Sequence, residues 1–136
     1  MDARNWLGTH PGTLLETLGI EVTEATPERV TATMPVGPRV HQPYGILHGG
    51  ASVALAETVA SIGATLNLDA ERQRAVGLEI NANHLRAIER GQLTATGTPL
   101  HRGRSTHVWQ VDIRNEGGQR VCISRCTLAI LAEGPS

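Results

Sequence analysis

The chain has 136 residues and a formal net charge of −1 at pH 7, with acidic and basic residues interspersed. This length suits a single domain, residues 1–136, with one core. The balanced charge gives no electrostatic signature of nucleic-acid binding. All twelve basic residues are arginines, and the lack of lysine excludes Schiff-base enzymes, pyridoxal phosphate enzymes and lysine-dependent phosphate loops.

The N-terminal part of the chain predicts a short helix and a hairpin. The helix is expected at Gly12–Leu18, and two strands are expected at Ile20–Thr23 and Arg29–Met34, joined by a turn at Ala25–Pro27. The first ten residues, MDARNWLGTH, do not form a cationic and then apolar signal pattern. This predicts a cytoplasmic protein.

A loop rich in glycine and proline, Gln42–Gly50, leads into an apolar run that ends at Leu68. The run predicts a helix at about Gly49–Leu66, buried on most sides because no face of it is charged. Glu57 is its one charged residue, and an isolated buried carboxylate costs about 2–7 kcal/mol unless it is paired or hydrogen-bonded. Glu57 is therefore either a structural residue with a hydrogen-bond partner or a catalytic carboxylate. Its place in mid-run, among many small residues, argues against a membrane span.

The start of this helix offers free backbone N–H groups at Gly49 and Gly50, directed outward with the positive end of the helix dipole. Such groups stabilise an oxygen that gains negative charge in a transition state. Glu57 lies roughly 12 Å further along the helix axis. One helix therefore cannot present both groups to the same carbonyl, and the spacing predicts a site shared between two copies of the chain.

Four strands are predicted after the helix, separated by glycines at hairpin spacing. They are Ala75–Leu85, Gln92–Leu100, His107–Arg114 and Arg120–Leu131. One long helix beside a mostly antiparallel sheet is an α+β fold. Cys122 and Cys126 would lie about 13 Å apart along the last strand, too far for a disulfide, and are expected to be buried thiols. The histidines show no metal-binding spacing, so no metal site is predicted.

Three segments, in this order, resemble the hotdog-fold acyl-CoA thioesterases: QPYGILHGGASVALAE, VGLEINANHLR and PLHRGRSTHVWQV. The likeness runs from about Thr33 to Leu131. It is greatest to the PaaI-like branch that contains the Arthrobacter-type 4-hydroxybenzoyl-CoA thioesterases and the 1,4-dihydroxy-2-naphthoyl-CoA hydrolases. The resemblance implies a central helix wrapped by a sheet of about five to six strands. It also implies a homo-oligomer, a tetramer built as a dimer of dimers, and no cofactor apart from the coenzyme A of the substrate.

The resemblance further implies roles for individual residues. Glu57 would attack the thioester carbonyl or activate a water, and the Gly49 N–H would polarise the carbonyl oxygen. Gln42 would orient the thioester, and His48 would shape the loop. Ser61, one helical turn after Glu57, would contact the water or the acyl group. Coenzyme A contacts are implied for Gly77, for the segment His84, Leu85, Arg86 and Ala87, and for the turn His101, Arg102, Gly103, Arg104, Ser105 and Thr106.

The predicted function is hydrolysis of an aromatic or otherwise bulky acyl-CoA to the free acid and coenzyme A. The alternatives are a hydroxyacyl dehydratase of the same fold and a non-catalytic acyl-CoA-binding protein. The sequence has no His-Phe-Pro-Gly loop of the dehydratase kind. The length of the chain leaves no room for the DNA-binding extension that acyl-CoA sensors usually carry.

Overall fold

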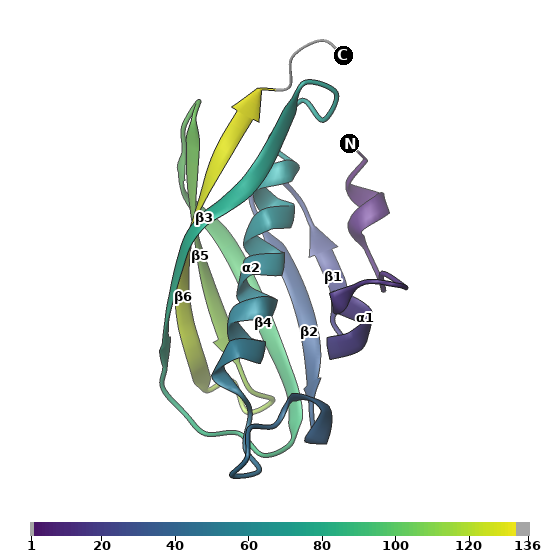
Figure 1. Cartoon of the computed structure of the whole chain (residues 1–136), viewed down its shortest axis with the longest axis vertical. Coiled ribbons are helices and arrows are strands. Elements are labelled where there is room, and N and C mark those ends of the chain that lie inside the picture. The colour runs from purple at the N-terminus through teal and green to yellow at the C-terminus, as the bar shows by residue number, and fades with distance from the viewer. Residues whose placement is uncertain (1, 133–136) are drawn as a thin grey trace.

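The computed structural model describes residues 2–132 as one antiparallel sheet curled around a long helix (Figure 1). The strands pair in the order β1-β2-β4-β5-β6-β3. They are β1 (Glu21–Ala25), β2 (Val30–Val36), β3 (Gln73–His84), β4 (Gly91–Arg102), β5 (Thr106–Arg114) and β6 (Arg120–Ala132). The helices are α1 (Leu14–Leu18) and α2 (Gly49–Thr65), with 3-10 turns η1 (Ala3–Trp6) and η2 (Pro38–Val40). The predicted α+β arrangement is confirmed, and the two 3-10 turns were not predicted.

Helix α2 has well-defined ends. At its start the imidazole of His48 caps the helix by accepting the N–H of Gly50 on Nδ1 at 2.7 Å. Beyond its end, the side-chain amide of Asn67 donates to the carbonyl of Gly63 at 2.8 Å and to that of Pro27 at 2.9 Å. These bonds satisfy backbone groups that a helix end leaves free and tie α2 to the loop between β1 and β2.

The core lies between α2 and the concave face of the sheet. Leu55, Val59 and Ile62 of α2 are buried there against Trp109 and other apolar side chains of the strands. The Trp109 ring packs directly on Gly63, where any side chain would collide with it. The absence of a side chain at Gly63 thus sets how closely the helix approaches the sheet.

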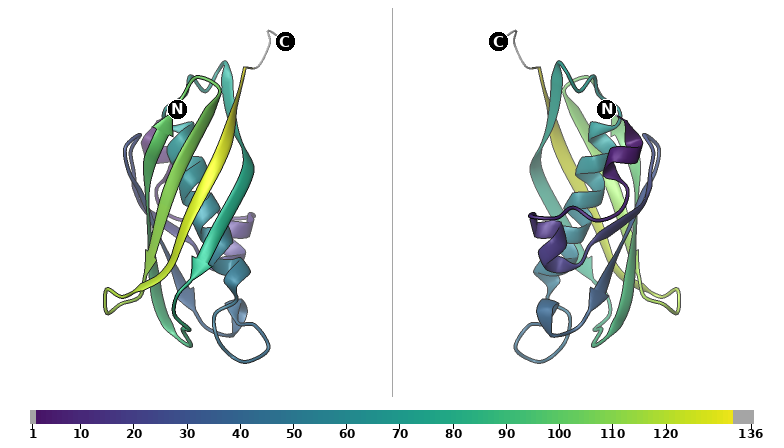
Figure 2. Two further views of the ribbon diagram at one scale, coloured as in Figure 1. Left: turned by 90° about the vertical axis from the view of Figure 1, so that its left-hand side faces the viewer. Right: turned by 90° about the vertical axis from the view of Figure 1, so that its right-hand side faces the viewer.

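The burial of α2 is one-sided, which corrects the prediction of a helix buried on most sides. Its sheet-facing residues are buried, but Val53, Ala54, Glu57, Thr58 and Ser61 on the opposite face are only half-buried. The reason is that one sheet can cover only one side of a helix. The N-terminal segment with η1 and α1 lies along part of the other side (Figure 2).

Strand β3 forms one edge of the sheet and pairs only with β6. Its register shifts between Gly77 and Glu79, which marks a β-bulge. A regular strand would direct Gly77 and His84 to opposite faces because their separation is an odd number of residues. The bulge moves both to the side that faces α2. This local irregularity decides which residues of β3 can contribute to a site on the helix.

The sequence-based element assignments agree with the structure to within a few residues. All six strands and both α-helices are present, although α1 is shorter than predicted. Cys122 and Cys126 are free and buried, as predicted. Among the helices formed by residues 2–132, none has the length and apolarity needed to cross a membrane.

Candidate functional site

Glu57 lies in the middle of α2, on the half-buried face of the helix. Its carboxylate rests against Gly77 of β3, and a Cβ at that position would collide with Glu57 Oε2. Glu57 also lines a pocket of about 420 Å³. The other lining residues of this Glu57 pocket are Trp6, Leu14, Leu15, Ala54, Thr58, Ser61, Ile62 and Thr65.

Few polar groups of the Glu57 pocket are free to meet a ligand. The Thr58 hydroxyl donates to the carbonyl of Ala54 at 2.7 Å, and the Thr65 hydroxyl donates to that of Ser61 at 2.8 Å. Within residues 2–132 the Ser61 hydroxyl has no such partner. The pocket therefore combines an apolar wall with one carboxylate and one available hydroxyl, and Ser61 lies beside Glu57 as its helical spacing predicts.

At the start of α2, one backbone donor is used and one is free. The N–H of Gly50 donates to His48, which fixes the imidazole as the tautomer protonated on Nε2. The N–H of Gly49 finds no acceptor among the described residues. The His84 ring stands next to Gly49, so close that a Cβ there would lie 2.9 Å from Nε2. The helix start therefore presents the Gly49 N–H next to an imidazole.

A second pocket of about 420 Å³ opens at this end of α2 and is called the helix-start pocket below. It is lined by Gln42, Ile46, Leu47, Gly49, Ser52, His84, Leu85, Arg86, Ala87 and Val121. The Gln42 Oε1 accepts the N–H of Tyr44, so the Gln42 side chain is held by its own loop. Ser52 is wholly buried, and its hydroxyl has no partner among the described residues.

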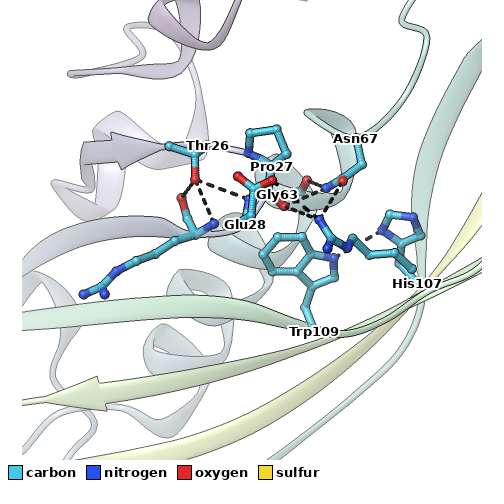
Figure 3. A network of polar contacts seen from close by, with 9 residues as sticks. Thr26, Pro27, Glu28, Gly63, Asn67, His107 and Trp109 are labelled. Carbon is cyan, nitrogen blue, oxygen red and sulfur yellow. Dashed lines mark hydrogen bonds and ion pairs between the residues drawn. The ribbon is translucent and has the colours of Figure 1, made fainter.

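The turn from His101 to Thr106 lies at the opposite end of α2. A pocket of about 310 Å³ there is lined by Asn67, Leu68, Gln73, Arg102, Gly103, Arg104, His107 and Ile130. Arg102 donates to Asn67 Oδ1 at 3.2 Å and to the Pro27 carbonyl at 3.5 Å, and it pairs with Glu28 at 3.9 Å (Figure 3). Arg102 is thus held by the fold, whereas Arg104 has no ion pair within the described part of the chain.

The three regions do not meet within one chain. Helix α2 has 17 residues and is roughly 25 Å long. His84–Ala87 lie at its start, Gly77 lies beside its middle, and His101–Thr106 lie beyond its end. The residues with implied coenzyme A contacts are therefore split between the two ends of the helix, and a single chain does not join them into one binding surface.

Two buried titratable groups near these regions have shifted pKa values. Burial, followed by the charges of Glu57 and Glu79, raises the pKa of the Cys126 thiol to about 12. Cys126 is therefore protonated at neutral pH and is not a nucleophile. Burial, followed by the charges of Arg102 and His101, lowers the pKa of His107. Its Nδ1 accepts the indole N–H of Trp109 at 3.3 Å.

Several residues that line these pockets were not predicted from the sequence. Trp6, Leu14 and Leu15 line the Glu57 pocket, and Ser52 lines the helix-start pocket. The sequence did offer a signal for Trp6, because it is one of only two tryptophans in the chain. Nothing in the sequence indicated that the N-terminal segment would fold back along α2.

Comparison with known proteins identifies the family. The family model of the thioesterase superfamily matches residues 44–122. The proofreading thioesterase EntH of Cronobacter turicensis is 47% identical over 123 residues, which cover 90% of this chain and 89% of that protein. The 1,4-dihydroxy-2-naphthoyl-CoA hydrolase of Listeria monocytogenes is 46% identical over 117 residues, which cover 86% of this chain and 94% of that protein.

A solved thioesterase structure from Staphylococcus aureus superposes with a TM-score of 0.84 at 43% identity, covering 86% of this chain and 97% of that one. The helix wrapped by an antiparallel sheet and the agreement in sequence lead to the same assignment. The chain belongs to the thioesterase superfamily and is a thioester hydrolase with the hotdog fold.

Proposed function

We propose that this thioesterase hydrolyses an acyl-CoA with an aromatic or otherwise bulky acyl group, releasing the free acid and coenzyme A. The position of Glu57 carries the proposal, because it is the one charged residue that lines an otherwise largely apolar pocket. The Listeria relative supports the substrate class, since its name gives an aromatic acyl-CoA as the substrate. No cofactor takes part, and coenzyme A belongs to the substrate.

Two reaction routes fit the carboxylate of Glu57. As a nucleophile, it adds to the carbonyl carbon, the C–S bond breaks, coenzyme A leaves as the thiolate, and water then hydrolyses the anhydride. As a general base, it takes a proton from a water whose oxygen adds to the carbonyl carbon, and the C–S bond of the resulting intermediate then breaks to release the acid and the coenzyme A thiolate. Both routes place negative charge on the carbonyl oxygen, which the Gly49 N–H stabilises.

The neighbouring residues have positioning roles in this proposal. The amide of Gln42 orients the thioester, and Ser61 contacts the water or the acyl group. His48 acts by capping α2, which keeps the Gly49 N–H directed outward.

Solved structures of the Staphylococcus aureus protein include alanine variants of a glutamine and of a glutamate. These two positions have the same separation as Gln42 and Glu57, which supports a joint role for the pair.

The exposed edge of β3 supports a site shared between two copies. This strand has twelve residues and no partner on its outer edge within the chain. Val76 and Leu78 along it are 37% and 62% exposed. A long, partly apolar edge strand favours pairing with another strand. We infer that two copies pair through β3 in antiparallel fashion, as an isologous dimer requires.

The register of this pairing follows from the bulge. Asn81 pairs with Arg125 of β6, while His84 pairs with Cys122 and Gly77 pairs with Leu128. His84 and Gly77 are therefore three strand positions from Asn81 in opposite directions, since the bulge at Leu78 adds no position. A two-fold axis at Asn81 would set Gly77 of one chain opposite His84 of the other.

This register would bring the catalytic groups together. Glu57 rests on Gly77, and His84 stands beside Gly49. With the axis at Asn81, the carboxylate of one chain would approach the Gly49 N–H of the second chain. Two equivalent sites per dimer would result. The larger assembly that we propose, a tetramer of two such dimers, would allow different chains to supply the two separated coenzyme A segments.

The test of the proposed function replaces the two key groups separately. Glu57→Gln should leave the fold intact and lower kcat for the best acyl-CoA by 10² or more. Gly49→Pro removes the N–H at the first helical position, which tolerates proline, and the extended backbone of His48 suits a residue before proline.

Gly49→Ala is the matched control, because it crowds His84 in the same way and keeps the N–H. The proline variant should have a kcat about 10² below that of the alanine variant. Hydrolysis of an acyl-CoA panel, followed by release of free thiol, measures both effects. A Glu57→Gln variant that retains more than a tenth of the wild-type rate would overturn the assignment of Glu57.

A further inference from the structure

The end of β3 lies beside the start of α2 (Figure 2). His84 is the last residue of that strand, and Gly49 is the first residue of that helix. A Cβ on Gly49 would have three atoms of the His84 ring as its nearest neighbours, with Nε2 at 2.9 Å. The backbone of Gly49 does not have a positive φ, and alanine is a better helix former than glycine. The close approach of the imidazole therefore explains the glycine.

Among the described residues, the start of α2 leaves one backbone donor without an acceptor. The N–H of Gly50 donates to His48 Nδ1, and the N–H of Ala51 donates to the His48 carbonyl. The N–H of Gly49 is the free one. Oxyanion holes are built from several preorganised donors, which can be backbone N–H groups and side chains together. A second donor at this place therefore has to come from a side chain near Gly49.

The imidazole of His84 is available as that donor. It is exposed, and neither of its ring nitrogens has a hydrogen-bond partner within residues 2–132. It lines the helix-start pocket together with Gly49. In the tautomer protonated on Nε2, the ring nitrogen nearest to Gly49 is a donor. The bulge in β3 makes this contact possible, because it sets the face of the sheet to which His84 points.

We propose that His84 is a catalytic residue that completes the oxyanion hole, because its Nε2–H and the Gly49 N–H both donate to the thioester carbonyl oxygen. Negative charge develops on this oxygen when the attacking oxygen adds to the carbonyl carbon, and it is lost when the C–S bond breaks. His84 stabilises the charge by a hydrogen bond and keeps its proton throughout. This inference rests on the proposed function, because it places the thioester carbonyl at Gly49.

The position of His84 favours this role over the coenzyme A contact that the family resemblance implies. Phosphate groups require cationic or backbone donors, and Arg86 in the same pocket is such a group. In the proposed dimer, His84 would lie opposite Gly77 of the second chain, on which the carboxylate of that chain rests. The imidazole would then stand beside both the Gly49 N–H and the attacking carboxylate, where the carbonyl has to lie.

The test compares His84→Leu, which removes the donor, with His84→Gln, whose side-chain amide supplies an N–H in its place. Both variants are assayed on benzoyl-CoA and on benzoyl-pantetheine, which lacks the nucleotide. Loss of one oxyanion donor should lower kcat about 10²-fold for both esters, with KM changed less than about threefold. His84→Gln should recover at least about tenfold of this loss, because it restores a donor.

Asn83→Leu is the matched control, because Asn83 precedes His84 on β3 and points to the opposite face of the sheet. It should keep kcat within twofold of wild type. A kcat of His84→Leu within threefold of wild type would overturn the proposal, and a rise in KM for benzoyl-CoA alone would then identify His84 as a nucleotide contact. Equal losses in His84→Leu and His84→Gln would also overturn it, since a structural role does not depend on a donor.

Infrared spectroscopy of the bound ester detects the hydrogen bond itself. Benzoyl-CoA labelled with ¹³C at the carbonyl is bound to the slow variant Glu57→Gln, and its C=O stretch should move to lower wavenumber than in the free ester. Adding His84→Leu to this variant should reduce the shift, and an unchanged C=O stretch would refute the bond. The proposed function fails separately, if Glu57→Gln remains active on these esters while His84 is intact.

Discussion

Glu57 and Gly77 illustrate how a missing side chain on a strand makes room for a carboxylate on a neighbouring helix. The carboxylate occupies the space that a side chain on β3 would fill. The backbone of Gly77 does not have a positive φ, so the glycine is required by this contact and not by backbone conformation. The family resemblance implies a coenzyme A contact for Gly77, and the structure adds that Gly77 accommodates Glu57.

Gly77→Ala should therefore reduce activity more than stability. The new methyl group displaces the flexible end of Glu57, so we expect kcat to fall at least tenfold while the melting temperature changes by less than about 3 °C. Gly37→Ala is the control, because Gly37 has an extended backbone and open space around its Cα. Steady-state kinetics and thermal melting measure the two effects, and a kcat within twofold of wild type would contradict the prediction.

His107 makes the stability of the protein depend on pH. Its pKa is lowered in the folded state, first by burial and then by the charges of Arg102 and His101. The unfolded chain, with a histidine pKa of about 6.5, then binds more protons than the folded chain at mildly acidic pH. Stability must therefore fall as the pH drops below about 6.5 towards the folded pKa.

His107→Asn should make this pH dependence weaker. The asparagine Oδ1 can accept the Trp109 N–H in place of Nδ1, and it does not titrate. We expect the melting temperature of the wild type to fall more between about pH 7.5 and pH 5.5 than that of the variant. His41→Gln serves as a control at a half-buried histidine. Equal losses in the wild type and in His107→Asn would show that other groups cause the acid sensitivity.

At the scale of elements, the end of α2 is joined to the β1–β2 loop by side-chain contacts (Figure 3). Asn67 connects the helix to Pro27, and Arg102 of β4 adds bonds to both residues. A turn rich in arginine at this end suggests phosphate binding from the sequence alone. The structure distinguishes the two arginines of this turn. Arg102 makes hydrogen bonds within the protein, whereas Arg104 has no ion pair within the described part of the chain.

Replacing these arginines separately should give different results. Arg102→Gln removes bonds within the protein and should lower the melting temperature by about 3 °C, the effect of about 1 kcal/mol. Arg104→Gln should leave the melting temperature unchanged and raise KM for acyl-CoA several-fold, more at low salt. Acyl-pantetheine esters, which lack the nucleotide, are the control. An equal rise in KM for both ester types would contradict nucleotide binding by Arg104.

At the scale of the whole molecule, the proposed shared site depends on the outer edge of β3, which has no partner strand within the chain. A single chain leaves the Glu57 carboxylate and the Gly49 N–H roughly 12 Å apart along α2. The proposed antiparallel pairing of two β3 strands about Asn81 would remove this separation, because each Gly77 would then lie opposite a His84. The bulge is essential to this geometry, since without it Gly77 and His84 would face opposite sides of the sheet.

Cysteine cross-linking tests the register. In Asn81→Cys the two substituted positions would lie directly opposite each other, with Cα atoms about 4.5–5.5 Å apart, within the range of a disulfide. We expect an interchain disulfide on mild oxidation, seen as a dimer on non-reducing gels. Asn83→Cys is the control, because its two copies would lie roughly 13 Å apart in this register. Cross-linking of Asn83→Cys but not of Asn81→Cys would refute an axis at Asn81.

The sequence by itself determined the elements, the family and the candidate carboxylate. The uncharged run after the glycine-rich loop indicated the long helix, and glycines at hairpin spacing indicated the four later strands, because these patterns reflect local structure. The isolation of Glu57 in an apolar run indicated a functional residue. Its helical distance from Gly49 indicated a second chain, since the rise of an α-helix is fixed.

Only the tertiary structure decided how these residues are grouped. The bulge in β3, the contact of Glu57 with Gly77 and the internal bonds of Arg102 depend on strand pairing and on contacts between distant segments. The same holds for Trp6 and Ser52, whose surroundings come from packing that no local pattern encodes. Helix α2 is buried on one side for the same reason. A single curled sheet covers that side, and the side that carries Glu57 is left to the N-terminal segment, which covers part of it (Figure 2).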